Sequence, residues 1–274
     1  MIDELVKDLE LYENLLALLL GMPRLFVMAQ VAPFMGNTVL TGQMRTAAVF
    51  ACYMVLHPAL VAQISAANVG SGSAAVIWCT AVILKECLLG LLLGFLSGFL
   101  FWAIMSAGFF IDNQRGASMA SDADPLSGEQ SSPFGTFFLQ STVYFFFSSG
   151  AFLAFLGLVY GSYEVWPVME LLPLSAMHYL AFPLFFARQV AWLVLMMLLL
   201  SGPVVVACLL TDVSLGLINR FASQLNVYVL AMPVKSGVAI FLMLIYFGML
   251  MADLPQMLGK IALDFQELQR LLAP

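Results

Sequence analysis

The chain has 274 residues, of which 62% are hydrophobic and only 9% are charged, and its mean hydropathy is +0.99. Soluble domains carry about 25% charged residues, so this composition excludes an ordinary soluble domain and predicts an all-α membrane protein with several crossings. The formal net charge of −6 leaves no basic patch for nucleic acid, and we expect no nucleic-acid partner.

Residues 1–14 alternate acidic side chains with apolar ones at helical spacing, which predicts an amphipathic helix. Its acidic face favours contact with protein over anionic lipid. Two apolar segments follow, Leu15–Phe34 and Met44–Ile64, and each has the roughly 20 residues that a bilayer crossing needs. The second contains His57, which we interpret as a packed or interfacial histidine because no second metal ligand lies at helical spacing.

Ala74–Phe110 is longer than one crossing requires and contains Lys85 and Glu86. Neighbouring residues on a helix point about 100° apart, so we expect each of these two charges to have its own partner elsewhere. Small residues then recur every four positions, a pattern typical of a close helix–helix approach. The pattern does not say which helix packs there. The stripe consists of Gly90, Gly94 and Gly98.

The longest polar stretch of the chain, Ile111–Pro133, separates two apolar segments. Its glycines and prolines argue against one continuous helix, so we predict a structured loop. Hydrocarbon cannot satisfy the backbone of such a loop, which must reach water, line a cavity or be buried in protein. Its polar side chains have two interpretations, a network that caps the loop and a role in gating. The candidate gating residues are Asp112, Gln114, Arg115, Gly116, Asp124 and Pro125.

The rest of the chain alternates apolar segments with polar breaks. The apolar segments are Phe134–Leu158, Leu180–Leu210 and Val227–Met251, and the breaks are Tyr160–Met177 and Thr211–Asn226.

Residues 253–274 again show apolar positions at helical spacing and predict an amphipathic helix. We expect about six apolar segments that form a single domain over residues 1–274.

Five charged residues lie inside apolar stretches: Arg24, Lys85, Glu86, Arg188 and Lys235. A charge at the centre of a bilayer costs roughly 2.5–3.5 kcal/mol, so we expect these side chains to face inward or towards partner subunits. Snorkelling to the membrane surface is the alternative for those near a segment end. For the polar residues around the third break we favour packing between subunits over contact with a substrate. These residues are Asp212, Arg220, Gln224 and Asn226, together with Lys235.

The distribution of Lys and Arg among the breaks does not follow the positive-inside rule. Arg45, Arg115 and Arg220 flank three of the breaks. A model with six crossings, however, places three basic residues on the side that is otherwise poor in them, namely Lys7, Lys260 and Arg270. Either the number of crossings differs from the number of apolar segments, or some apolar helices do not cross the membrane.

Several ordered stretches resemble a known family. They are KECLLGLLLGF from Lys85, AGFFIDNQRGAS from Ala107, DADPLSGEQSSPFG from Asp122, SYEVWP from Ser162, and the long stretch SGPVVVACLLTDVSLGLINRFASQLNVYVLAMPVKS from Ser201. Their order and spacing resemble the T subunit of the bacterial type III secretion export apparatus (SctT), the injectisome relative of flagellar FliR. Ser223 departs from this pattern, because relatives usually have proline there.

This resemblance implies a subunit that joins the R and S subunits in a helical export gate at the bacterial inner membrane. Other export components of that membrane would also be partners, and unfolded substrate proteins would pass through the gate. Helical hairpins would pack into the assembly, with some apolar helices above the bilayer plane. The loop matching Ile111–Pro133 would act as a plug that helps to close the pore. The resemblance also implies a protein that is not an enzyme, so we expect no catalytic, cofactor or metal site.

The sequence leaves one alternative of a different class, a secondary transporter that uses Arg24, Lys85, Glu86 and Lys235 as a substrate or proton site. Transporters usually contain paired repeats with matching broken helices, and this chain shows only an echo between Asp112 and Asp212. No catalytic motif points to an enzyme.

Overall fold

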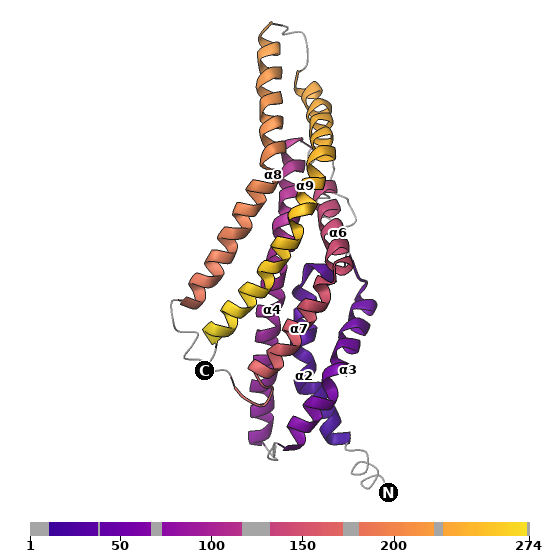
Figure 1. The fold of residues 1–274 in the computed structure, drawn as a ribbon, viewed down its shortest axis with the longest axis vertical. Coiled ribbons are helices and arrows are strands. Elements are labelled where there is room, and N and C mark those ends of the chain that lie inside the picture. The colour runs from indigo at the N-terminus through magenta and orange to yellow at the C-terminus, as the bar shows by residue number, and fades with distance from the viewer. Residues whose placement is uncertain are drawn as a thin grey trace. The chain divides into compact units, whose positions relative to one another are not determined.

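The computed structural model of the protein describes residues 11–37, 39–66, 73–116, 132–171, 181–221 and 227–272. All regular elements in these ranges are helices, which confirms the predicted all-α class. In chain order (Figure 1) they are α2 (Leu11–Val31), the short 3-10 helix η1 (Pro33–Met35), α3 (Gly42–Ala66), α4 (Ser73–Gln114), α6 (Pro133–Ser148), α7 (Ala151–Val165), α8 (Ala181–Phe221) and α9 (Val227–Leu272).

Five of the described helices, namely α2, α3, α4, α8 and α9, are long and apolar enough to cross a membrane. A sixth span results if α6 and α7 together make one broken crossing. The count agrees with the expected six apolar segments, and the chain is a multi-pass membrane protein.

The chain divides into two compact units. Unit 1 comprises residues 1–98, 151–185 and 261–274, and unit 2 comprises residues 99–150 and 186–260. Three helices, α4, α8 and α9, run from one unit into the other.

In unit 1, helix α2 packs along α3, and the two lie side by side in Figure 1. It also packs closely on α4. A Cβ atom added at Gly90 would meet the backbone carbonyl of Arg24, and one added at Gly94 would lie 2.8 Å from the carbonyl oxygen of Met28. The sequence predicted the close approach, and the structure identifies α2 as the neighbour of both glycines.

In unit 2, the second half of α4 packs equally closely on α6. A Cβ atom added at Gly108 would lie 2.6 Å from the backbone of Phe134 and Gly135. Further along the same two helices, the rings of Phe101 and Phe146 meet edge-to-face with their centroids 5.4 Å apart. Helix α6 is thereby held against the second half of α4 at its start and near its end.

The polar loop starts later than the sequence predicts, because Ile111–Gln114 belong to α4. Ile111 is fully buried, so this last turn has a packing reason to stay helical. The helix ends where Gly116 takes a φ of +79°, a backbone conformation that suits glycine and that commonly terminates helices. The predicted break therefore begins at Arg115.

The predicted break Thr211–Asn226 is also wrong over its first eleven residues, since α8 continues to Phe221. The hydroxyl groups of Thr211 and Ser214 donate hydrogen bonds to the carbonyls of Ala207 and Leu210, one turn back in the same helix. Polar side chains of this kind are satisfied within a helix, so their presence did not mark its end. Residues 222–226 lie outside the described part of the chain.

The predicted break Tyr160–Met177 is wrong at its start for a different reason. Helix α7 runs to Val165 and ends before the dipeptide Trp166-Pro167. A residue that precedes proline is sterically pushed out of the helical conformation. Here the proline, rather than the first polar residue, sets the end of the helix.

Conversely, the segment predicted as Phe134–Leu158 is two helices, interrupted at Ser149 and Gly150. Gly150 takes a φ of +78° and ends the first helix.

The predicted tail helix is not separate from the last apolar segment, because α9 is continuous over 46 residues. Its predicted apolar stripe is present, and all seven of its positions are buried or half-buried: Leu254, Met257, Leu258, Ile261, Phe265, Leu268 and Leu272. The predicted helix over residues 1–14 lies mostly outside the described residues, and its last four residues begin α2.

Candidate functional site

Unit 1 contains a buried ion network centred on Glu86 of α4. The guanidinium of Arg24 in α2 binds this carboxylate with two hydrogen bonds, from Nε to Oε2 at 2.7 Å and from Nη2 to Oε1 at 2.9 Å. Both side chains have no solvent exposure. Because paired parallel hydrogen bonds suit the planar guanidinium, this contact fixes the register of α2 against α4.

The remaining donors of Arg24 reach the end of α7. Nη1 donates to the hydroxyl of Ser162 at 3.0 Å, and Nη2 donates to the carbonyl of Trp166 at 2.8 Å. The guanidinium carbon also lies 4.0 Å from the centre of the Tyr163 ring, a cation–π contact. Arg24 therefore joins three helices through one buried side chain.

Lys85 lies beside Glu86, and the contact between them shows that one expectation was wrong. Its Nζ atom is 2.8 Å from Oε1 of Glu86, although neighbours on a helix were expected to have separate partners. The flexible four-carbon stem of lysine allows the ammonium to turn back to the adjacent side chain. The same ammonium also donates to the carbonyls of Pro167, Val168 and Glu170.

Unit 2 contains the second cluster, where the described chain enters and leaves the polar loop. We call it the loop neck, and it consists of Asp112, Arg115, Ser132 and Phe134. The Asp112 carboxylate accepts hydrogen bonds from the Ser132 hydroxyl at 2.6 Å and from the backbone N–H of Phe134 at 2.9 Å. Asp112 thus caps the start of α6 from the last turn of α4, where the partial positive charge of a helix N-terminus favours an anion.

The other oxygen of Asp112 binds Arg115. Oδ1 lies 2.7 Å from Nε and 2.6 Å from Nη2 of the guanidinium, which also covers the Phe134 ring at 4.7 Å. Ser132 in turn caps α6 by accepting from the N–H of Gly135 at 3.0 Å. These contacts tie Arg115 and Ser132, which lie at or next to the described ends of the loop, to one buried carboxylate.

Other candidate residues of the sequence lie elsewhere. Lys235 of α9 pairs with Asp212 of α8 at 3.0 Å, and the Asp212 side chain is 42% exposed. Arg188 and Arg220 are exposed on α8, while Gly98 is buried in α4 and Gln114 half-buried at its end. Asp124, Pro125, Gln224 and Asn226 lie outside the described residues, as do residues 117–131 of the loop.

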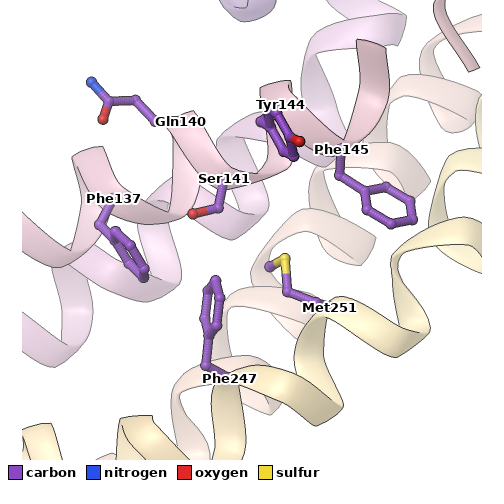
Figure 2. A pocket seen from close by; sticks show the side chains of 7 residues that line it. All are labelled: Phe137, Gln140, Ser141, Tyr144, Phe145, Phe247 and Met251. Carbon is purple, nitrogen blue, oxygen red and sulfur yellow. The ribbon is translucent and has the colours of Figure 1, made fainter. Parts of the chain in front are cut away.

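An open groove of about 470 Å³ lies between α6 and α9 in unit 2 (Figure 2). Phe137 and Phe247 approach each other across it, with ring centroids 5.0 Å apart, and Met251 points into it from α9. The residues that line it carry no charge, and most of the surface that they offer is apolar. They are Phe137, Gln140, Ser141, Tyr144, Phe145, Phe247 and Met251.

Sequence patterns did not reveal the partners that complete both clusters. Ser162, Tyr163 and Ser132 were not singled out, although the first two belong to the SYEVWP stretch. One signal was available, because Glu86 precedes Gly90 and Gly94 at the same four-residue spacing. The helix that packs on the glycines therefore also has to meet the carboxylate. Arg24, Arg188 and Lys235 were the cations inside other apolar segments, and the spacing alone does not choose among them.

Comparison with known proteins assigns the chain to a family. The sequence model described as "Bacterial export proteins, family 1" matches residues 15–261. Over 251 residues the chain is 31% identical to the surface presentation of antigens protein SpaR of Salmonella typhimurium, which covers 89% of this chain and 88% of the relative.

Two further relatives align over a shorter region. The chain is 44% identical over 162 residues to the Yop proteins translocation protein T of Yersinia pestis, and 35% identical over 161 residues to the flagellar biosynthetic protein FliR of Bacillus subtilis. Each alignment covers 59% of this chain and 61% of the relative. The chain belongs to the family of bacterial export proteins that contains the T subunits of the type III export apparatus.

Proposed function

We propose that this protein is a pore and gate subunit of a type III secretion export apparatus in the bacterial inner membrane. It would join the R and S subunits, form part of the channel for unfolded proteins and help to close that channel between export events. The proposal assigns it a structural role without catalysis, and the energy for export would come from partner proteins. Membership of the export family and the apolar helices support this role.

The observation that carries the gating role is the loop neck. Residues 117–131 connect α4 to α6. Asp112 binds the described chain on both sides of them, through Arg115 on the α4 side and through Ser132 and Phe134 on the α6 side. A plug needs a fixed base so that its position is defined when it closes a pore. The loop neck would supply this base. It also makes the two interpretations of the polar loop compatible, because the network that caps the loop would support its gating role.

The transporter alternative has less support. It requires charges that can exchange a substrate or a proton, whereas Arg24, Lys85 and Glu86 bind one another and the backbone carbonyls of unit 1. A saturated buried network of this kind serves packing, because each group would be costly to uncover.

The plug role is tested by removing the loop from the assembled gate. Deletion of residues 118–131, or their replacement by a Gly–Ser linker of equal length, is expected to make membrane vesicles that contain the gate leaky to small ions or dyes. The linker variant keeps a connection of normal length between α4 and α6, so it separates loss of the plug from strain at the loop neck. An unchanged permeability barrier in a normally assembled complex would refute the plug role.

The neck itself is tested with Asp112→Asn, which keeps the shape of the side chain but removes its charge. We expect a measurable leak with normal recovery of the complex, because the amide cannot hold Arg115 and the start of α6 together as the carboxylate does. Asp253→Asn is the matched control, since Asp253 lies exposed on α9. Equal permeability of the two variants would remove Asp112 from the gating mechanism.

A further inference from the structure

The segment that follows α7 folds around a single positive charge. Three of its backbone carbonyl oxygens converge on Nζ of Lys85, at 2.7 Å from Pro167, 3.0 Å from Val168 and 2.9 Å from Glu170. Oε1 of Glu86 completes the set at 2.8 Å. The ammonium is thus enclosed by four oxygen atoms, one of which belongs to a carboxylate.

This arrangement has the chemistry of a cation site. Carbonyl and carboxylate oxygens are the ligands that hard cations choose, but Ca²⁺ binds them at about 2.3–2.6 Å and Mg²⁺ at about 2.0–2.1 Å. Distances of 2.7–3.0 Å fit a larger monovalent ion, such as an ammonium. The three N–H donors of lysine match the three carbonyls, and the Glu86 carboxylate supplies the opposing charge.

The internal hydrogen bonding of the segment would hold this shape only weakly. Among the described residues, its internal backbone hydrogen bond runs from the N–H of Glu170 to the carbonyl of Pro167, at 3.3 Å. Three converging carbonyl dipoles would repel one another without a cation between them. The Lys85 side chain is only 5% exposed, so water has little access to replace the ammonium.

We propose that Pro167–Glu170 is a monovalent-cation site that the chain fills with its own Lys85 ammonium, and that the segment takes its fold only around that cation. Two contacts extend the effect beyond the segment. Trp166 gives its carbonyl to Arg24, and its indole N–H lies 3.4 Å from the carbonyl of Leu272 in the last turn of α9. Binding of the Lys85 ammonium therefore also sets the position of Trp166, which contacts both α2 and α9.

The test is chemical rescue in the full-length protein. Lys85→Ala removes the stem beyond Cβ together with the ammonium, and n-propylammonium replaces the missing atoms. We expect amide hydrogen exchange over residues 163–171 to become roughly tenfold faster or more in the variant, because local opening then costs less free energy. Added n-propylammonium should restore much of the protection. Tetramethylammonium at equal ionic strength and 1-propanol should not, since the first has no N–H and the second no charge.

Two further variants keep the proposal falsifiable if Lys85→Ala does not fold. Lys85→Met retains the bulk of the stem without the charge, and exchange over residues 163–171 should rise although the space remains filled. Lys260→Ala removes a half-buried lysine of α9 that binds Gln189, and it should leave exchange over this segment unchanged. Wild-type protection in Lys85→Met, or a loss in Lys85→Ala that n-propylammonium does not reverse, would overturn the proposal.

Discussion

At the scale of single residues, Glu86 balances two buried cations. Arg24 and Lys85 both bind its carboxylate, and all three side chains are buried. Glu86→Gln leaves this positive charge uncompensated, and removal of one partner from a buried pair typically costs about 3–5 kcal/mol. We therefore expect the variant to unfold at a clearly lower denaturant concentration, as measured by circular dichroism of the purified chain in mild detergent.

The matched control is Glu164→Gln on α7, where the glutamate is exposed and the substitution should change stability little. A second control replaces Arg24 and Glu86 together by methionine and keeps Lys85, to which the carbonyls of Pro167–Glu170 are bound. Well-packed apolar residues often replace a buried ionic group without loss, so this variant should be more stable than Glu86→Gln. If Glu86→Gln were as stable as the wild type, the network would not hold unit 1 together.

At the scale of elements, the contact between α2 and α4 depends on the absence of a side chain at Gly90. Gly90→Ala places a methyl group against the backbone carbonyl of Arg24, which can give way only if the helix moves. Overpacking of this kind typically costs about 1–3 kcal/mol. Gly202→Ala in α8 is the matched control, because a Cβ atom there meets no atom within 4 Å. We expect thermal unfolding of the purified chain to shift down for Gly90→Ala only, and equal shifts would contradict the close approach.

At the scale of the whole molecule, the chain leaves a large apolar surface uncovered. Phe221 is 89% exposed and Leu244 79% exposed, and few residues of the membrane-type windows in α8 and α9 are buried. If the export-gate proposal holds, purification of the tagged protein in mild detergent should recover a large complex with two other small apolar membrane proteins, identified by mass spectrometry. Recovery as a stable monomer or homodimer would contradict that proposal and favour the transporter alternative.

Patterns that repeat along the sequence predicted the structure well. The apolar stripe from Leu254 to Leu272 and the glycine spacing at Gly90 and Gly94 both depend on helical periodicity, which local sequence shows directly. Helix ends were predicted less well, because polar composition was taken as a sign of a break. In α8 the hydroxyl groups of Thr211 and Ser214 satisfy themselves on their own helix, so polarity there carried no information about its end.

The long-range partners of the buried charges could not be predicted from the sequence, for a different physical reason. Arg24 and Glu86 are 62 positions apart, and Asp112 lies 22 positions from the N–H of Phe134 that it binds. Such pairs depend on which helices pack together, and local spacing does not determine that. The sequence could show that a charge in an apolar segment needs a partner, but it could not name Ser162 or the carbonyl of Trp166 as that partner.

Helix α4 has a consequence for how membrane crossings are counted in this protein. With 42 residues and a rise of 1.5 Å per residue it is about 63 Å long, roughly twice the 30 Å thickness of a hydrocarbon layer. Tilting would have to reach about 60° to contain it, beyond the range of about 0–40° found for membrane helices. Part of α4 must therefore lie outside the hydrocarbon layer, and its burial within the chain indicates that other helices cover much of its apolar surface. A hydropathy profile of this protein thus records contact with apolar protein as well as depth in the bilayer.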